Sequence, residues 1–318
     1  MPWRPSASLS ALRARARLLA SVRVFFADRN VLEVETPALC QAGVTDPSIE
    51  PLVVSAGVSV GAPRYLQSSP EYAMKRLLAA GSGPIYQVSR VFRDGEAGAR
   101  HNPEFTLLEW YRPELDHHSL MDEVSQLVKN ILGDLREQRV SYRDLFHQYL
   151  SIDPFVASDE ELVALANERL DVGALSGDRD LWLDLLLSHC IEPQLAERGG
   201  LTFVFDYPAS QAALARIEED REGLVARRFE LYVDGVELAN GYLELTDPQE
   251  QRKRFTADNA RREASGQQTR PLDEHLLAAM AEGLPPCSGV ALGIDRLLML
   301  AQGASSVSEV IAFDWSSA

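Results

Sequence analysis

The chain has 318 residues, 46% of them hydrophobic and 25% charged, and its 31 basic and 47 acidic side chains give a formal net charge of −16 at pH 7. This composition is that of a globular protein and excludes a largely disordered chain. The acidic balance also excludes a broadly basic nucleic-acid binder, so that only a local basic patch could hold tRNA or DNA.

The cysteines and the apolar segments exclude further classes of protein. Cys40, Cys190 and Cys287 lie far apart, and an odd number without close spacing argues against a disulfide framework and a zinc ribbon. No apolar run approaches the ~18 residues of a membrane span, and the first residues lack the apolar core of a signal peptide. We therefore expect a cytoplasmic protein with reduced thiols and no membrane partner.

The first third of the chain is predicted to mix helices and short strands. A helix capped by Ser8 or Ser10 has apolar residues at helical spacing as far as Phe26, and an alternating strand over 31–37 ends at Pro37. Short strands are predicted around 52–55, 58–60 and 64–67, and a helix over 70–80. Two longer strands, 85–93 and 105–112, enclose a polar loop and indicate an antiparallel hairpin with a long tip.

The rest of the chain is predicted to be helical at first and mixed again towards its end. The predicted helices of the middle third are 119–138, 141–150, 159–170 and 178–196. The predicted strands that follow are 201–206, 227–234 and 236–246, the last two joined by Asp234-Gly235, a common hairpin turn. Helices over 248–264 and 271–282 precede a buried strand at 289–293, which runs into a helix at 294–300.

This order of elements predicts an α+β fold. Antiparallel strands are interrupted by helices without a regular βαβ alternation. No linker rich in proline, glycine or serine divides the chain, so we predict one domain over 1–318 with a helical insertion at about 115–200. Walker, GxGxxG, HExxH and GxSxG motifs are absent, so a nucleotide would have to bind on the antiparallel sheet.

Three groups of residues could carry chemistry. The first surrounds the predicted long hairpin, where Arg93 can bind a phosphate bidentately and Glu109 interrupts an apolar run between Leu108 and Trp110. The alternative there is a charged, solvated hairpin. The second group has evenly spaced carboxylates at Glu230, Glu237 and Glu244. Mg²⁺ is typically bound by carboxylates together with phosphates, although a simple alternation of polar residues would explain some of the three.

The third group is Gly289-Val290-Ala291-Leu292-Gly293-Ile294-Asp295-Arg296, in which glycines permit close approach of a ligand and Arg296 stands at a helix start. Together the three groups resemble the motifs of class II aminoacyl-tRNA synthetases, most closely lysyl-tRNA synthetase, from about residue 10 to 315. Motif 1 resembles 22–37, motif 2 resembles 92–109 and motif 3 resembles 289–296. The resemblance implies an antiparallel catalytic sheet flanked by helices, and a homodimer.

The resemblance also assigns roles in binding ATP and Mg²⁺. It implies that Arg93 holds the α-phosphate and Arg296 the γ-phosphate as the catalytic pair, and that Phe105 stacks on adenine. The implied ATP site further includes Asp94, Gly95, Glu96, Asn102, Glu237, Leu238 and Gly293. Glu230 and Glu237 are expected to bind Mg²⁺. The family's usual Arg-Asn-Glu is Arg93-Asp94-Gly95-Glu96 here, so either Glu96 or the backbone makes the contact to the adenine amino group.

A second set of roles concerns the amino acid. The resemblance implies that the substrate amino groups are recognised by Glu71, Glu109, Tyr111 and Glu244. Ser69 precedes Pro70 where lysyl-tRNA synthetases tend to have alanine, and Ala291 stands where they have glycine. Both differences would reshape the pocket by one small group, which is worth ~1–3 kcal/mol and is enough to favour one lysine isomer.

The likeness extends to a particular branch of the family. Motif 1 begins almost at the first residue, which leaves no room for the anticodon-binding barrel of lysyl-tRNA synthetases. The chain thus resembles the stand-alone paralogues that use ATP to attach (R)-β-lysine to a lysine of elongation factor P, without a stable tRNA partner. The alternatives are a truncated lysyl-tRNA synthetase, a non-catalytic regulatory paralogue, and a ligase for another small amino acid.

Overall fold

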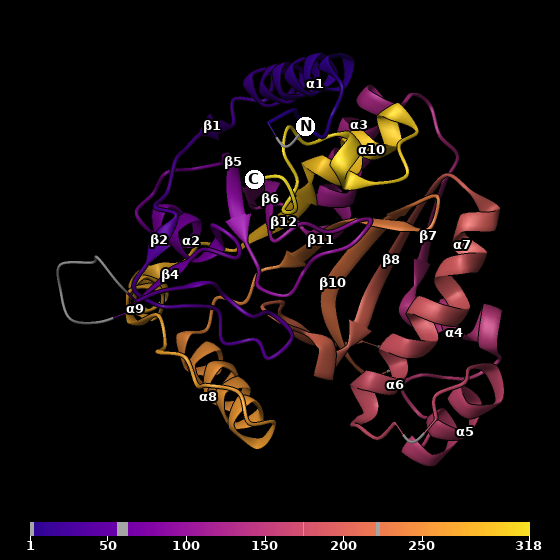
Figure 1. Ribbon diagram of the computed structural model, residues 1–318. Coiled ribbons are helices and arrows are strands. Elements are labelled where there is room, and N and C mark those ends of the chain that lie inside the picture. The colour runs from indigo at the N-terminus through magenta and orange to yellow at the C-terminus, as the bar shows by residue number, and fades with distance from the viewer. Residues whose placement is uncertain (1–2, 56–62, 174, 221–222) are drawn as a thin grey trace. The chain divides into compact units, whose positions relative to one another are not determined.

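The computed structural model describes residues 3–55, 63–173, 175–220 and 223–318 (Figure 1). The chain divides into two compact units, each described here by itself. The first comprises Met1–Asp116, Gln126–Gly133 and Thr246–Ala318, and the second comprises His117–Ser125 and Asp134–Leu245. The strand predicted at 58–60 lies outside the described residues.

The first unit is built on four strands in the order β1 (Leu32–Glu33), β5 (Ile85–Phe92), β6 (Glu104–Pro113) and β12 (Cys287–Gly293). β1 is parallel to β5, whereas the β5–β6 and β6–β12 pairs are antiparallel. The predicted long hairpin is therefore confirmed. A second, small sheet has the order β2 (Leu39–Cys40), β4 (Arg64–Leu66) and β3 (Val53–Val54).

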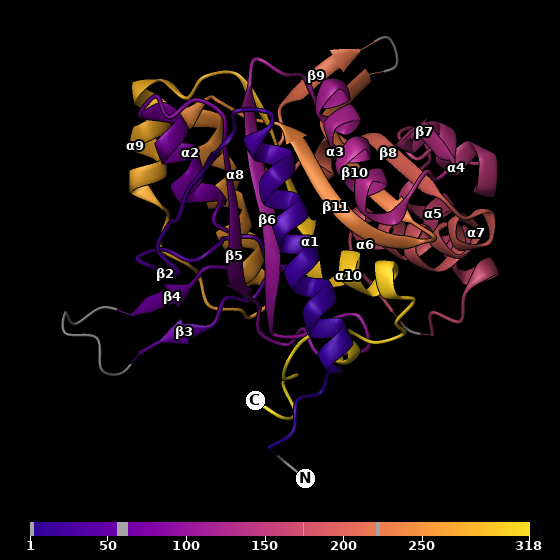
Figure 2. The ribbon, with the colours of Figure 1, turned by 90° about the horizontal axis from the view of Figure 1, so that it is seen from above.

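One face of the larger sheet is closed by helix α1 (Leu9–Ala27), which runs alongside β5 and β6 in Figure 2. Its first turn is capped by Ser8, whose hydroxyl accepts a hydrogen bond from the Ala11 N–H at 3.1 Å. At its other end the Phe26 ring stacks on Tyr86 at 4.4 Å and meets Trp110 edge-on at 5.3 Å. This face therefore belongs to the core.

The remaining helices of the first unit include a group of three and a helix that follows β12. α2 (Glu71–Ala79), α8 (Pro248–Ala264) and α9 (Glu274–Gly283) lie together to one side of β5 in Figure 2. α10 (Ile294–Gln302) follows β12 directly, and a short 3-10 helix spans Val307–Glu309. Among the described residues, no helix has the length and apolarity that crossing a bilayer requires.

The second unit has strands in the order β11 (Val236–Leu243), β10 (Gly223–Val233), β8 (Leu201–Pro208) and β7 (Glu137–Ser141), with β9 (Ile217–Asp220) also paired to β10. Only the β7–β8 pair is parallel. The β10–β11 turn has positive φ at Asp234 and Gly235 (48° and 73°), which confirms the predicted hairpin. A Cβ at Gly235 would lie 2.5 Å from Ala196, so only glycine fits there.

Helices α4 (Tyr142–Leu150), α5 (Asp159–Arg169), α6 (Arg179–Leu186) and α7 (Glu192–Arg198) gather beside β7 and β8 (Figure 1). A π-helical turn over Leu187–Ile191 joins α6 to α7, and a 3-10 turn spans Ala209–Gln211. The core beneath them includes the fully buried Phe146, Leu186 and Val204.

Some predicted elements differ from the structure in their bounds, and one short strand was missed. The helix predicted over 119–138 is α3 (His117–Leu132), because Gly133 with φ +91° ends it and β7 takes the following residues. The strand predicted over 31–37 pairs with β5 only at Leu32 and Glu33. β9 was not predicted, because its sequence, Ile217–Asp220, is mostly acidic and has no apolar alternation.

Candidate active site

The open face of the β5–β6–β12 sheet carries a row of residues from three strands. Gln87 pairs with Glu109, and Glu109 pairs with Ala291 on its other side. Residues that are directly opposite in neighbouring strands project to the same face, so these three side chains lie together. Tyr111 and Gly289 form the next row on that face. Glu109 is 1% exposed and Gln87 is 2% exposed.

Arg93 and Phe105 extend the same face towards the end of the hairpin. Phe105 alternates with Glu109 along β6, and the Arg93 guanidinium lies 5.1 Å from the centre of the Phe105 ring. The Arg93 Nη1 is 3.5 Å from the Glu96 carboxylate, which is a weak contact, and its buried Nε has no hydrogen-bond partner among the described residues. Arg93 therefore keeps donors for an anion.

The carboxyl group of Glu109 is the most perturbed acid on this face. Its pKa is raised to about 8, first by burial and then by the nearby charge of Glu71, while Ser69, Arg93 and Tyr111 act in the opposite direction. The Tyr111 hydroxyl donates to Glu109 Oε2 at 3.4 Å, and Oε1 has no partner among the described residues. An acid of this kind is ready to receive a cationic group, which would replace its proton.

Helix α2 brings Glu71 to the neighbourhood of Glu109. Pro70 stands at the helix start as predicted, and the Ser69 hydroxyl accepts from the Glu71 N–H at 3.0 Å. One turn further on, the Lys75 ammonium, whose side chain is 1% exposed, donates to Glu71 Oε1 at 2.6 Å. Glu71 is therefore held by a buried cation on its own helix.

Arg296 lies in the first turn of α10 and packs over Gly293, whose missing Cβ would lie 3.8 Å from three carbons of the arginine side chain. Its Nη2 is 2.7 Å from His101 Nε2. Burial, and then the charge of Arg296, lower the pKa of His101, so the neutral ring can accept this hydrogen bond. The contact links the start of α10 to the loop between β5 and β6.

The start of α10 is fixed by an ion pair on the core side of the sheet. Arg15 of α1 contacts Asp295 at 2.5 Å and donates to the Thr106 hydroxyl at 2.6 Å. Asp295 also accepts from the Thr106 N–H at 2.8 Å. Thr106 and Asp295 belong to the segments that resemble motifs 2 and 3, and Arg15 lies on the helix that leads into the segment resembling motif 1. Their contact joins these three parts of the chain and sets the position of the neighbouring Arg296.

The loop after Arg93 is held by backbone contacts. The Asp94 N–H donates to the Glu50 carbonyl at 2.7 Å, and Gly95, with φ +78°, turns the chain. At the end of the loop Asn102 is 8% exposed, and its amide accepts from the Trp315 N–H at 2.9 Å and donates to the Glu104 carbonyl at 2.7 Å. The Asn102 side chain thus ties the loop to residues near the end of the chain.

In the second unit, Glu230 lies in a saturated polar cluster. Its Oε2 accepts from the Tyr207 hydroxyl at 2.7 Å and from the Tyr232 hydroxyl at 2.6 Å, and its Oε1 is paired with Arg228. The carboxylate is 7% exposed. Since three donors already contact its two oxygens, this geometry weighs against Glu230 as the Mg²⁺ ligand expected from the sequence.

The other predicted residues of the second unit lie on β11 or directly after it. Glu237 is half-buried opposite Tyr232, next to a β-bulge, and Leu238 is 3% exposed. Glu244 is 2% exposed and forms an isolated bridge with Ala215. No cluster of three or more metal-ligating side chains occurs among the described residues. That is compatible with Mg²⁺ held by one or two carboxylates together with phosphates.

The structure thus brings most of the predicted residues of the first unit onto one sheet face and its borders. Glu230, Glu237, Leu238 and Glu244 belong to the second unit.

Three neighbours of the predicted site residues were not predicted from the sequence. Gln87 interrupts an apolar run just as Glu109 does, and Lys75 follows Glu71 at helical spacing, so both had a readable signal. His101 lies in a recognised segment, but nothing in its spacing indicates its contact with Arg296.

Comparison with known proteins identifies relatives over almost the whole chain. Residues 1–316 match the family model described as tRNA synthetases class II (D, K and N). A protein of Photorhabdus laumondii subsp. laumondii named elongation factor P--(R)-beta-lysine ligase is 50% identical over 316 residues, which cover 98% of this chain and 97% of the relative. Proteins of the same name from Pseudoalteromonas translucida and Proteus mirabilis are 51% and 50% identical, with the same coverage.

Proposed function

The chain belongs to the class II tRNA synthetases (D, K and N), and from this premise we propose that it is an ATP-dependent, AMP-forming ligase that joins (R)-β-lysine to a lysine ε-amine of elongation factor P. The observation that carries the proposal is the pairing, on one sheet face, of an arginine that keeps free donors with a buried acid that keeps a free acceptor. These groups suit the two ends of the reaction, a phosphate and a diamine.

Arg93 supports the binding of ATP. The Arg93 guanidinium, whose Nε has no partner among the described residues and whose Nη1 is loosely held, could bind an α-phosphate bidentately through one of its edges. Phe105 beneath it offers a flat apolar surface to a base. Arg296, at the start of α10, would add charge at the γ-phosphate after releasing His101. Asp94, Gly95, Glu96, Asn102 and Gly293 stay in the proposed ATP site, and Leu238 keeps the ATP-binding role that the family resemblance gives it.

Glu109 and Glu71 support a substrate with two amino groups. An ammonium that reaches Glu109 Oε1 would displace the proton held there and satisfy the unpartnered atom. Tyr111 is placed to orient the same carboxyl group through its hydroxyl. Ser69, Pro70 and Ala291 complete the proposed amino-acid site, with Ala291 adding one methyl group beside Glu109. Glu244 keeps the substrate-binding role that the family resemblance gives it.

The chemistry proceeds in two steps that balance. In the first, the substrate carboxylate attacks the α-phosphorus, the bond to the leaving pyrophosphate breaks, and Arg93 and Arg296 stabilise the negative charge that develops. In the second, the deprotonated ε-amine attacks the carbonyl carbon of the aminoacyl-adenylate, AMP leaves, and the amine loses a proton. The side chains act by position and charge and form no covalent bond to the substrate.

A divalent metal fits the residues of β11. We propose that Glu237, which is half-buried, is the protein ligand of Mg²⁺, and that Glu230 has a structural role because its oxygens are occupied. When bound, Mg²⁺ neutralises charge on the phosphates.

The proposal includes a cytoplasmic homodimer, since its protein substrate acts in translation. The apolar side chains of Leu9, Val24 and Leu32, on α1 and β1, are 68%, 60% and 56% exposed and could be covered by a second copy. A truncated lysyl-tRNA synthetase is the alternative that shares this face.

ATP–pyrophosphate exchange tests the proposed function. Purified protein is incubated with ATP, Mg²⁺ and labelled pyrophosphate, and with either (R)-β-lysine or α-lysine. We expect exchange that depends on the amino acid and is faster with (R)-β-lysine. Exchange with neither isomer would contradict the proposal and favour a non-catalytic paralogue, and exchange with α-lysine alone would favour a tRNA synthetase.

A further inference from the structure

Arg262 is a fully buried cation of the first unit that lies away from the reacting groups. It lies near the end of α8, and its side chain is 0% exposed. A buried charge must be paired and hydrogen-bonded, because desolvation of an ion is costly. Its contacts therefore show which part of the fold depends on it.

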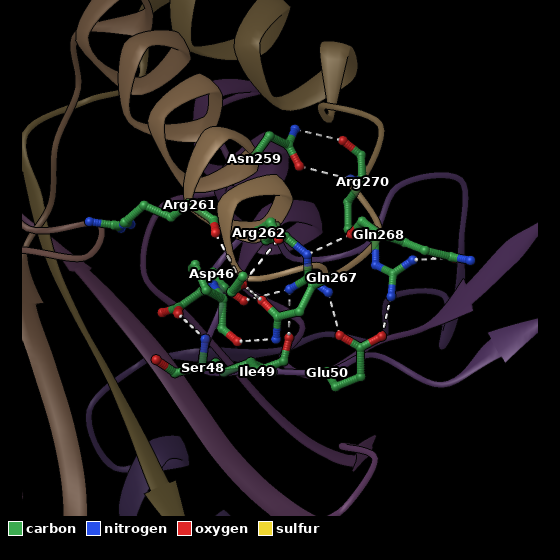
Figure 3. Close-up of polar contacts among 12 residues, drawn as sticks. Asp46, Ser48, Ile49, Glu50, Asn259, Arg261, Arg262, Gln267, Gln268 and Arg270 are labelled. Atoms are coloured by element: carbon green, nitrogen blue, oxygen red, sulfur yellow. Dashed lines mark hydrogen bonds and ion pairs between the residues drawn. The ribbon is translucent and has the colours of Figure 1, made fainter. Parts of the chain in front are cut away.

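Those contacts bind together two loops that are far apart in the sequence (Figure 3). The Arg262 Nη1 donates to the Asp46 carbonyl at 3.0 Å, and Nε donates to the Gln268 carbonyl at 2.8 Å. Next to it, the Gln267 side chain donates to the Pro47 carbonyl at 3.0 Å. Loop 43–50 is thereby fixed to the end of α8 and to the segment that follows.

Glu50, at the end of that loop, receives two arginines. Its Oε2 is paired with Arg262 and its Oε1 with Arg270, as Figure 3 shows. Arg270 is 6% exposed, and its backbone exchanges two hydrogen bonds with the Asn259 side chain at 2.8 and 2.9 Å. The carboxylate is therefore held from two sides.

The backbone of Glu50 makes the contact that reaches the site. Its carbonyl accepts the Asp94 N–H at 2.7 Å, directly after Arg93. On the other side, the Arg93 N–H donates to the Pro103 carbonyl at 2.9 Å. The course of the chain at Arg93 is thus set by two backbone bonds, one of which ends on the residue that the arginines hold.

We propose that Glu50, Arg262 and Arg270 form a clamp that positions the nucleotide-binding loop 93–102, and with it the Arg93 guanidinium. The three are positioning residues, since none contacts a reacting group. The proposal rests on the proposed function in taking ATP as the ligand of Arg93. Without the clamp, loop 43–50 would no longer fix the Asp94 N–H, and ATP would meet a loop that must first be ordered.

The test compares Arg270→Met with Arg270→Lys. Arg270→Met removes one arm of the clamp, and we expect the KM for ATP in pyrophosphate exchange to rise by about 10-fold, since small misplacements of binding groups have effects of this size or larger. The KM for (R)-β-lysine should change by less than about 2-fold, because the amino-acid residues lie on other elements. Arg270→Lys keeps the charge beside Glu50 and should restore part of the ATP affinity.

Arg252→Gln is the matched control. Arg252 lies on α8, the helix of Arg262, and its side chain donates to Glu274 at 2.8 Å and not to loop 43–50. This variant should leave both KM values unchanged. A variant of Arg270 that is folded, by its melting temperature, and has an unchanged KM for ATP would overturn the clamp, and so would an equal rise in both KM values.

Calorimetric titration with ATP alone separates the two proposals. If the wild-type protein binds ATP but shows no exchange, the proposed function fails while the clamp is still tested by the dissociation constant for ATP of Arg270→Met. Should Arg270→Met not fold, Glu50→Gln provides the same comparison, because it keeps the carbonyl that accepts from Asp94 and removes the charge that the arginines hold. Unchanged ATP affinity in the folded variant would again contradict the clamp.

Discussion

Two buried carboxylates of this protein, Glu109 in the first unit and Glu230 in the second, differ in how many donors surround them. Glu230 receives two tyrosine hydroxyls and the Arg228 guanidinium, whereas Glu109 receives one long bond from Tyr111 and has an unpartnered Oε1. Burial alone does not distinguish them, since Glu230 is 7% exposed and Glu109 is 1% exposed. A carboxylate whose donors are supplied by the protein is structural, and one that lacks them is ready for a ligand.

The arginines repeat this contrast. Arg228 donates to Asn240, to the Gln211 carbonyl and to Glu230, while the buried Nε of Arg93 has no partner among the described residues. Both arginines also lie over an aromatic ring, Tyr207 and Phe105 respectively. The comparison teaches that unsatisfied polar atoms, more than residue types, mark the proposed site.

The largest expected effect is at Arg93. Arg93→Met should lower the rate of pyrophosphate exchange by about 10³-fold, because a donor aimed at developing charge is worth 10²–10³-fold or more. Arg90→Met is the control: Arg90 lies on β5, three residues before Arg93, and its exposed side chain pairs with Glu104 at 3.6 Å. If the two variants lose activity equally, the contrast between paired and free arginines fails.

The second prediction exchanges the roles of two acids on neighbouring strands. Glu230→Gln should lower the free energy of unfolding by about 3 kcal/mol, since it leaves Arg228 without its charged partner, and should leave the exchange rate of the folded protein within a few-fold of wild type. Glu237→Gln should do the reverse, with an unfolding curve close to wild type and an exchange rate that is about 10²-fold lower. Denaturant unfolding and exchange assays measure both, and a stable but inactive Glu230→Gln would show that Glu230 binds the metal.

The third prediction concerns pH. The pKa of Glu109 is raised to about 8, so the free protein holds a proton there at neutral pH, and an arriving ammonium must displace it. The kcat/KM for the amino acid should therefore rise about tenfold per pH unit up to pH 8 and then level off. Glu109→Gln should abolish that dependence.

Folding stability gives an independent reading of the same group. The raised pKa means that the folded state of the free protein favours the protonated acid, so the contribution of Glu109 to stability is greatest at low pH and is lost as the pH rises from about 4.5 to about 8. The unfolding free energy of Glu109→Gln should fall less over that range. A wild-type profile that is flat between pH 6 and 8, in both kcat/KM and stability, would contradict an orphaned acid at this position.

The smallest expected effect is at Ala291. Its methyl group lies beside Glu109, and Ala291→Gly should shift the preference between (R)-β-lysine and α-lysine by about 5-fold, or ~1 kcal/mol, towards α-lysine. The ratio of the two kcat/KM values in pyrophosphate exchange measures this shift. An equal change with both isomers would mean that the methyl group does not contribute to selection.

The sequence could predict those parts of the fold and site that depend on local patterns. The hairpin of β5 and β6, the cap at Ser8 and the placement of Glu109 follow from alternation and from a charged residue within an apolar run. The saturation of Glu230 could not be predicted, because one of its donors, Tyr207, comes from 23 residues away on another strand. The clamp is even harder to predict from the sequence, because the Arg262–Glu50 contact joins residues that are 212 positions apart.

The central claim, that the activated amino acid is transferred to a protein, is tested most directly by the acceptor. The purified protein is incubated with ATP, Mg²⁺ and labelled (R)-β-lysine, together with either unmodified elongation factor P or lysine tRNA, and the label is followed by mass spectrometry of the factor and by acid precipitation of the tRNA. The account predicts one β-lysyl group on a lysine of elongation factor P and no charged tRNA. Charged tRNA with an unmodified factor would contradict it.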